Sequence, residues 1–264
     1  RHEFVAADFI MQRLFSQHAQ ELGAVAPAQE YAAAADRTER YLQSAAARVR
    51  MSTPQLVAGR LESQVEVENL GGHKLPTAFP SRRAWLHILV KDALGERVFE
   101  SGAMRADGAI DGNPNDADPA RYAHHLQEIR KPGDVQIYES ILGDAHGAVT
   151  TGLLSAVRYL KDNRLLPHGF EKSTADPQIA VQGDAQSDPG FSGGGDRIKL
   201  SVDTAGAAGP FEVEVELRYQ PIGYRWAENL RPFKSAETSR FTGYFRADAS
   251  HSATTLASAR ARSR

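Results

Sequence analysis

Alternating apolar and polar positions divide the chain into a helical N-terminal part and a longer β-rich part. In residues 3–22 the apolar side chains recur every three or four positions, and residues 28–50 repeat this helical period in an alanine-rich stretch. Alanine is the best helix former, which supports the second helix. Gly23 and Pro27 separate the two segments, so the sequence predicts a helical hairpin over residues 1–51.

From residue 52 onward the apolar period becomes two, which is typical of half-buried strands. The most regular alternation runs from Phe211 to Tyr219, where every second residue is charged. Strands are expected at six places: 61–67, 85–91, 96–100, 135–142, 197–202 and 211–219. We therefore expect an α+β protein, mainly β, in which the hairpin precedes an antiparallel β-sandwich of about seven strands, Ig-like or jelly-roll-like, over residues 52–248.

Two long loops interrupt the predicted sandwich, at residues 103–133 and 167–196. Loops of this length are usually functional or disordered. A short helix is expected at residues 151–157, where neither period is clear. The last stretch, residues 249–264, consists mostly of Ser, Ala and Arg without an apolar period, and we expect it to be a disordered tail.

Composition excludes several classes of protein. The 264 residues include 31 basic and 33 acidic ones, so charge gives no sign of a nucleic-acid partner. No apolar run is long enough for a membrane span. Cysteine is absent, which excludes disulfides, thiolate metal ligands and covalently attached haem within these residues. Residue 1 is Arg, and we expect either a removed leader or the distal part of a longer polypeptide.

The loop around residues 106–118 is rich in side-chain oxygens at close spacing. Such oxygens suit a hard cation, and the start of the loop is similar to an EF-hand, although the glycine and glutamate at its sixth and twelfth positions are absent. The alternative is an Asx-rich surface turn. A second acidic, glycine-rich loop at 182–196 is expected to be a structural turn. The candidate calcium ligands are Asp111, Asn113, Asn115, Asp116 and Asp118.

Histidines raise the question of a metal hydrolase built from His73, His124 and His125. Adjacent histidines cannot both face one way on a strand, and no His-Glu-x-x-His helix or Gly-x-Ser-x-Gly turn is present. Catalysis by these residues alone is therefore not expected. His73 follows Gly71 and Gly72 and precedes Pro76, a pattern that indicates a rigid corner. Such a histidine either satisfies the corner by hydrogen bonding or serves as an axial haem ligand.

The sequence of this corner, Gly-His-Lys-Leu-Pro-Thr at 72–77 continued by Pro-Ser-Arg-Arg-Ala-Trp-Leu-His at 80–87, resembles a segment of bacterial multihaem c-type cytochromes. Four other stretches are similar to the same family, and together they extend from residue 2 to about residue 230. These stretches are His2-Glu3-Phe4 with 9–14, Gly112 to Pro119, Val135 to Glu139, and Tyr159 to Pro167.

The resemblance implies the haem-free C-terminal portion of such a cytochrome, an accessory module for haem shielding or docking in electron transfer. His2, His73 and His125 match histidine positions of the family, which implies that one or more of them supplies a distal axial ligand to haem c on a preceding segment. It further implies a periplasmic or extracellular location and partners that are the haem-bearing region, another cytochrome or redox proteins. The alternative is a stand-alone β-sandwich, perhaps stabilised by calcium, that binds a carbohydrate or a protein.

Overall fold

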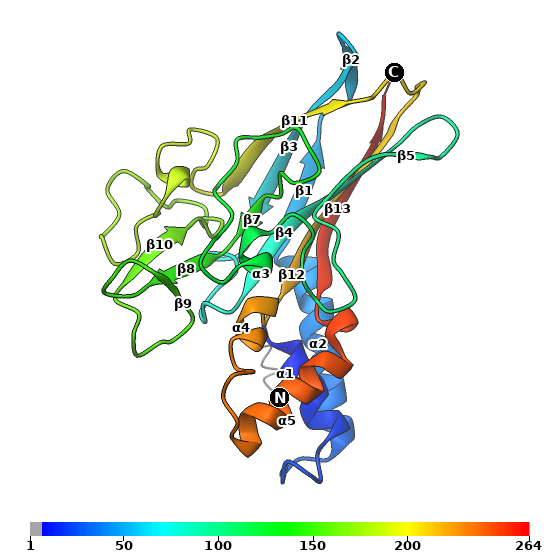
Figure 1. The fold of residues 1–264 in the computed structure, drawn as a ribbon. Helices are drawn as coiled ribbons and strands as arrows, with labels where there is room; N and C mark the ends of the chain where they lie inside the picture. The colour runs from blue at the N-terminus through cyan, green and yellow to red at the C-terminus, as the bar shows by residue number, and fades with distance from the viewer. Residues whose placement is uncertain (1–6, 264) are drawn as a thin grey trace.

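The computed structural model describes residues 7–263, and it begins with the predicted helical hairpin (Figure 1). Helix α1 spans Phe9–Gln17 and helix α2 spans Ala28–Ala45. Asp8 caps α1, because its carboxylate accepts a hydrogen bond from the Met11 amide at 3.1 Å. The ring of Phe15 stacks on Tyr31 with 5.4 Å between centroids, so the two apolar faces pack on each other.

The second helix ends five residues earlier than predicted. Residues Ala47–Met51 form strand β1, and their side chains alternate between buried and exposed. Val49 is buried and pairs with Val67 of the neighbouring strand. Packing of this alternating pattern outweighs the weak helix propensity of the alanines, so the prediction of a helix to residue 50 is wrong.

One sheet of the sandwich is built around two long antiparallel strands. Strand β3 (Arg60–Asn69) pairs with β11 (Gly195–Asp203) over nine residues, from Asp203 opposite Arg60 to Gly195 opposite Glu68. The flanking strands are β1, β2 (Gln55–Val57) and β6 (Glu128–Ile129), the last of which runs parallel to β11.

The second sheet has strand order β13–β12–β4–β5, with β7 also paired to β4. Its central strands are β4 (Arg83–Lys91) and β12 (Glu212–Gln220), both close to their predicted positions. The outer strands are β5 (Arg97–Ser101), β7 (Ile137–Tyr138) and β13 (Thr254–Arg262). The predicted disordered tail is therefore wrong, because most of it is strand β13 on the edge of this sheet.

The core lies between the two sheets and extends to the helices. Apolar residues of β3 and β11 face those of β4 and β12, and each fully buried side chain of this size contributes about 1.5–3 kcal/mol. Phe9, Ile10 and Leu14 of α1 belong to the same buried cluster, so the hairpin shares the core of the sandwich. The structure is thus an α+β fold, mainly β, with an antiparallel sandwich. Among the described helices, none is long and apolar enough to cross a membrane.

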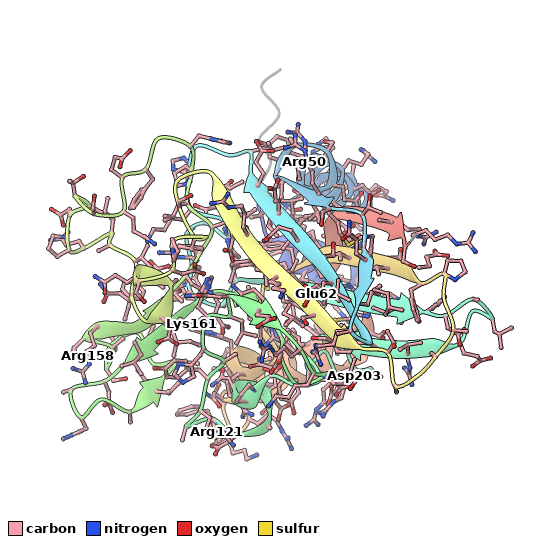
Figure 2. All side chains as sticks on the ribbon, turned by 90° about the horizontal axis from the view of Figure 1, so that it is seen from above. Arg50, Glu62, Arg121, Arg158, Lys161 and Asp203 are labelled. Atoms are coloured by element: carbon pink, nitrogen blue, oxygen red, sulfur yellow. The ribbon has the colours of Figure 1, made fainter. Side chains whose placement is uncertain are left out.

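A small three-stranded sheet stands beside the sandwich and has the order β10–β8–β9. Its strands are β8 (Ser140–Gly143), β9 (Val149–Thr150) and β10 (Arg158–Asp162). Residues 151–157, predicted as a short helix, form turns instead. In Figure 2, Arg158 lies at the outer edge of this sheet and Lys161 lies near its junction with the sandwich, in agreement with an exposed Arg158 and a buried Lys161.

Short helices complete the fold. Helix α3 is Pro114–Ala117, α4 is Tyr224–Glu228, and α5 is Ala236–Ala247. Two single 3₁₀ turns cover Asp184–Gln186 and Ala249–His251. Helix α5 packs beside the N-terminal hairpin (Figure 1), where the Tyr244 ring stacks on His18 at 3.7 Å between centroids. This arrangement brings the C-terminal part of the chain against its first described helix.

Candidate functional site

The His73 corner has a fixed main chain and an exposed side chain. Asn69, which ends β3, donates a hydrogen bond from Nδ2 to the His73 carbonyl at 2.7 Å and accepts one from the Gly71 amide at 2.9 Å. Asn69 Nδ2 also donates to the Leu165 carbonyl at 3.0 Å. Two residues after His73, Leu75 forms an antiparallel bridge with Leu165. One buried asparagine thus holds both sides of the corner.

A buried ion cluster anchors the corner further. Lys74 donates from Nζ to Asp162 at 2.7 Å, and Arg164 donates from Nε and Nη2 to the two oxygens of the same carboxylate at 2.8 Å each. The Asp162 side chain is only 1 % exposed. Burial raises the pKa of Asp162, but the bonds from Arg164 and Lys74 outweigh it and leave the pKa below its usual value. The residue after His73 is therefore tied to strand β10.

The His73 side chain itself is exposed, and no hydrogen bond joins its ring to another residue in the described part of the chain. Its ring nitrogens thus face outward from a rigid support. An imidazole held in this way is accessible to a group from outside these residues. His2, which was also predicted as a distal haem ligand, lies outside the described residues.

His125 is placed in the opposite way, with its side chain only 1 % exposed. Its Nδ1 lies 2.7 Å from Gln136 Nε2 and 3.0 Å from Asn163 Nδ2. Its Nε2 lies 3.0 Å from Asp188 Oδ2. A buried ring with both nitrogens engaged is not available to an external haem, so the structure does not support the prediction that His125 is a distal ligand.

The neighbouring amides determine where His125 holds its hydrogen. Gln136 accepts the Leu126 amide at Oε1 (2.8 Å), and Asn163 accepts the Glu139 amide at Oδ1 (3.1 Å). Both side chains must therefore point their NH₂ groups at Nδ1, which acts as an acceptor. The hydrogen is then on Nε2 and is donated to Asp188. Burial is the main reason that the pKa of His125 falls to about 4.

Asp196, at the start of β11, completes this buried cluster. Its Oδ2 accepts hydrogen bonds from the Tyr138 hydroxyl at 2.9 Å and from Gln136 Nε2 at 3.1 Å. Its Oδ1 is buried and has no hydrogen-bond partner among the described residues. Burial, reinforced by the nearby charge of Asp188, raises the pKa of Asp196 to about 7.

His125, Asp188 and Asp196 are also the group of side chains close enough together to suggest a metal ion, with candidate ligand atoms within 4.8 Å of one another in the described residues. The hydrogen-bond pattern does not fit this reading. A histidine bound to a metal through Nε2 normally donates its Nδ1 hydrogen to an acceptor. Here two NH₂ groups point at Nδ1, and the Nε2 hydrogen points at the carboxylates. Hydrogen bonds therefore occupy the atoms of His125 that would bind a metal ion.

His73 and His124 are exposed whereas His125 is buried, so the three histidines do not form one cluster among the described residues. His124 and His125 face opposite sides of their loop. His124 is exposed and lies 2.7 Å from Asp184, whereas His125 points inward.

In the predicted calcium loop, most of the oxygens serve local hydrogen bonds. Asn113 caps α3 by accepting the Asn115 amide, and Asp118 accepts the Ala120 amide at 2.9 Å. Asp116 is buried, where it accepts the Ile110 amide at 2.8 Å and the Arg83 guanidinium at 2.7 Å. Because an arginine already supplies the positive charge, these contacts favour the turn over a calcium site.

Asn115 of this loop is buried and donates to the Arg121 carbonyl at 2.6 Å, while Asp111 is exposed. The second acidic loop, 182–196, was predicted as a structural turn, and it contains a 3₁₀ turn at Asp184–Gln186. It also supplies Asp188 and Asp196 to the buried cluster, a role that the sequence did not reveal. The available signal was the pair His124-His125, one of which must face inward.

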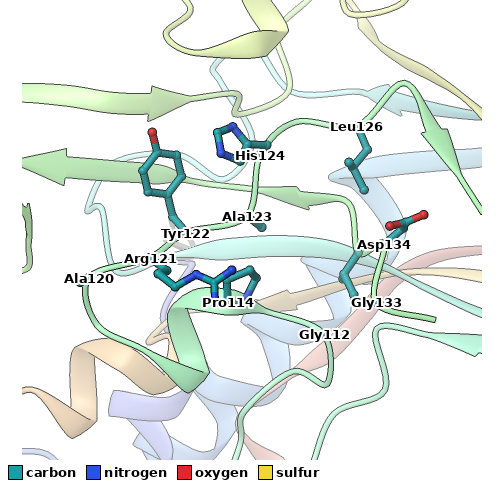
Figure 3. Close-up of a pocket in the computed structure, with 11 residues that line it drawn as sticks. Gly112, Pro114, Ala120, Arg121, Tyr122, Ala123, His124, Leu126, Gly133 and Asp134 are labelled. Atoms are coloured by element: carbon teal, nitrogen blue, oxygen red, sulfur yellow. The ribbon is translucent and has the colours of Figure 1, made fainter. Parts of the chain in front are cut away.

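A surface cavity of about 360 Å³ lies on the outer side of the first long loop (Figure 3). Its polar lining includes Arg121, Tyr122, His124 and Asp134. Asp134 is already engaged, since its Oδ2 accepts the main-chain amides of Arg130 and Lys131 at 3.0 and 3.1 Å. The cavity is open to solvent and separate from the inward-facing His125.

Comparison with known proteins gives little further information. No protein-family model and no curated protein matches the sequence. Among solved structures, the chain is similar to a penta-haem cytochrome c552 from Thermochromatium tepidum, with 16 % identity and a TM-score of 0.47. The similarity covers 85 % of this chain but only 41 % of that one, so the chain spans less than half the length of that protein. Because the TM-score is below 0.5, no function is inferred from this likeness.

Proposed function

We propose that the chain is a haem-free accessory module of a multihaem electron-transfer protein, and that His73 provides an axial ligand to a haem carried on another segment. The observation on which this rests is the exposed His73 imidazole on a corner fixed by Asn69 and by the Lys74–Asp162 ion pair. Neutral imidazole is a standard axial ligand for haem iron. A rigid main chain reduces the entropy lost when such a ligand binds.

The absence of cysteine is consistent with this role, because the haem would be attached to the other segment. Only His73 retains support as a ligand in the described residues, since His125 is buried. When bound, the haem would supply the redox chemistry, while this chain would orient the imidazole and cover one side of the ring. The proposal places the module in the periplasm or outside the cell.

An exposed apolar surface supports a docking role. Leu153 and Leu154, in the loop between β9 and β10, are 52 % and 105 % exposed, and Val157 is 65 % exposed. Contiguous exposed apolar residues often mark an interaction site. This loop leads into β10, the strand that ends at Asp162 and so anchors the His73 corner. The haem-bearing region is the partner that this arrangement suits.

The test is to express the complete gene and record its visible spectrum with and without His73→Ala. We expect Cys-x-x-Cys-His motifs before residue 1, and we expect His73→Ala to convert one low-spin haem to a high-spin form. His146→Ala is the matched control, because His146 is also exposed but lies in a turn of the β8–β9 hairpin. A gene without haem motifs, or an unchanged spectrum in His73→Ala, would refute the proposal.

A further inference from the structure

The buried cluster of His125, Asp188 and Asp196 has an imbalance of charge. The Asp188 and Asp196 side chains are 4 % and 0 % exposed. Among the described residues, Lys161 Nζ pairs with Glu139 at 3.0 Å, whereas Lys172 Nζ donates to the main-chain oxygens of Ala185, Asp188 and Phe191 and its charge acts on both carboxylates. One cation therefore faces two carboxylates. Two buried carboxylates so close together cannot both remain ionised without a large cost in free energy.

The geometry indicates which group neutralises the second charge. His125 cannot, because Gln136 and Asn163 donate to Nδ1 and leave only the Nε2 hydrogen of a neutral ring. Asp188 accepts this hydrogen at Oδ2 and the Gly190 amide at Oδ1 (2.7 Å), as an ionised carboxylate does. Asp196 accepts two hydrogen bonds at Oδ2. Its Oδ1 has no hydrogen-bond partner among the described residues and can carry the proton.

We propose that Asp188 and Asp196 form a single-proton site, with Asp196 protonated and Asp188 ionised, and that this proton keeps a second charge out of the contact between the two long loops. His125 comes from the first loop, whereas Asp188 and Asp196 come from the second, which ends where β11 begins. This role is independent of haem ligation, because it involves none of the residues of the His73 corner.

Charged and titratable groups face the site from each neighbouring segment. The Tyr138 hydroxyl approaches from β7, and burial holds its pKa well above the usual value. The Lys161–Glu139 pair lies on the side of Asn163, and Lys172 and Asp184 lie on the second loop side. None of these groups donates to Asp196 Oδ1. Release of the proton would therefore place an uncompensated second charge in the site.

The pH range follows from the two pKa values. The pKa of Asp196 is about 7 in the folded chain against an ordinary value of 3.8, so the folded chain retains this proton between about pH 4 and 7 after the unfolded chain has lost it. Above pH 7 the second charge appears, and the contacts that hold the loops should loosen. The amides of Gly190 and Leu126 report on these contacts, since they donate to Asp188 and Gln136 respectively.

The experiment is an infrared titration of the purified chain in the carboxyl region from pH 5 to 9. We expect a band from a protonated carboxylic acid at pH 5.5 that disappears with a midpoint near 7, is absent in Asp196→Asn and is retained in Glu66→Gln. Glu66 is the control because it is exposed on β3. In ¹⁵N spectra of the unmodified chain, the amide signals of Gly190 and Leu126 should shift with the same midpoint.

These outcomes keep the proposal open to refutation even if Asp196→Asn does not fold, because both titrations can be read in the unmodified chain. A folded chain with no protonated-acid band at pH 5.5 would overturn it. So would stoichiometric binding of Zn²⁺ or Ca²⁺ that removes the band, because the cluster would then be a metal site.

Discussion

Two histidines of this protein each lie beside two carboxylates, yet His87 favours the protonated ring and His125 the neutral one. His87, on β4, lies 3.1 Å from Glu216 and 3.0 Å from Glu100 on the solvent-facing side of the sheet. The hydrogen bond to Glu216 is the main cause of a raised His87 pKa. His125 lies 3.0 Å from Asp188, but burial lowers its pKa to about 4. Whether each of these histidines is protonated therefore depends on its access to solvent and on the group that faces its other ring nitrogen.

At His87 both ring nitrogens face acceptors, which favour the doubly protonated ring. At His125 the second nitrogen faces two NH₂ groups, which favour a neutral ring. The difference has a practical consequence for sequence analysis. Counting acidic neighbours cannot give the charge of a histidine unless the amide orientations around it are known.

The largest difference should appear in stability. His125→Ala leaves the donors of Gln136 and Asn163 and the Asp188 carboxylate without their partner, so the free energy of unfolding should fall by about 2–4 kcal/mol. His87→Ala removes a partly solvated ion pair and should cost about 0.5–1 kcal/mol. Urea denaturation at pH 7 measures both. Equal losses in the two variants would show that the buried network is not as strongly coupled as its geometry indicates.

The two sites should also respond to pH in opposite ways. The folded pKa of His87 lies above 6.5, so its stabilisation is complete below about pH 6.5 and is lost as pH rises through the raised value. The folded pKa of His125 is about 4, so its contribution grows as pH rises from 4 to 6.5. The advantage of the unmodified chain over His87→Gln should thus shrink from pH 6 to 9, and its advantage over His125→Gln should grow from pH 4 to 6.5.

Denaturation at several pH values, followed by circular dichroism, separates these trends. If the advantage over the two variants changed with pH in the same direction, the assignment of a protonated His87 and a neutral His125 would be contradicted. The smallest effect is expected at the third site, where His73→Ala should change the unfolding free energy of the chain by less than about 0.5 kcal/mol, because the exposed ring has no described partner. A loss above 1 kcal/mol would show that the ring supports the corner itself.

The sequence predicted the regular parts of the fold well. Strand β12 was clear because every second residue from Phe211 to Tyr219 is apolar and buried. Strand β13 was missed because Ala257, Ala259 and Ala261 are too small to show an apolar face among serines and arginines. In this strand the pairing with β12, rather than the local pattern, decides the structure.

The candidate sites were harder to predict, for a physical reason. The rigid His73 corner follows from local glycines and proline, whose conformational effects can be read from the sequence. The His125 cluster depends on Asp188 and Asp196, which lie 63 and 71 positions away and come from a loop without a recognisable motif. Only the folded chain brings such residues together. For the same reason, the sequence could not show that the candidate calcium ligand Asp116 pairs with Arg83.

The C-terminal strand also has a consequence for biosynthesis. Gln43 of α2 donates a hydrogen bond to Thr254 of β13 across 211 positions, and the Tyr219 hydroxyl binds the Ala7 carbonyl across 212. During translation the first helices therefore emerge long before their neighbours exist. Because contacts so distant in sequence form slowly, the hairpin keeps an exposed apolar face until strand β13 has been synthesised. A chaperone that shields Phe9 and Leu14 during this interval should raise the yield of folded protein.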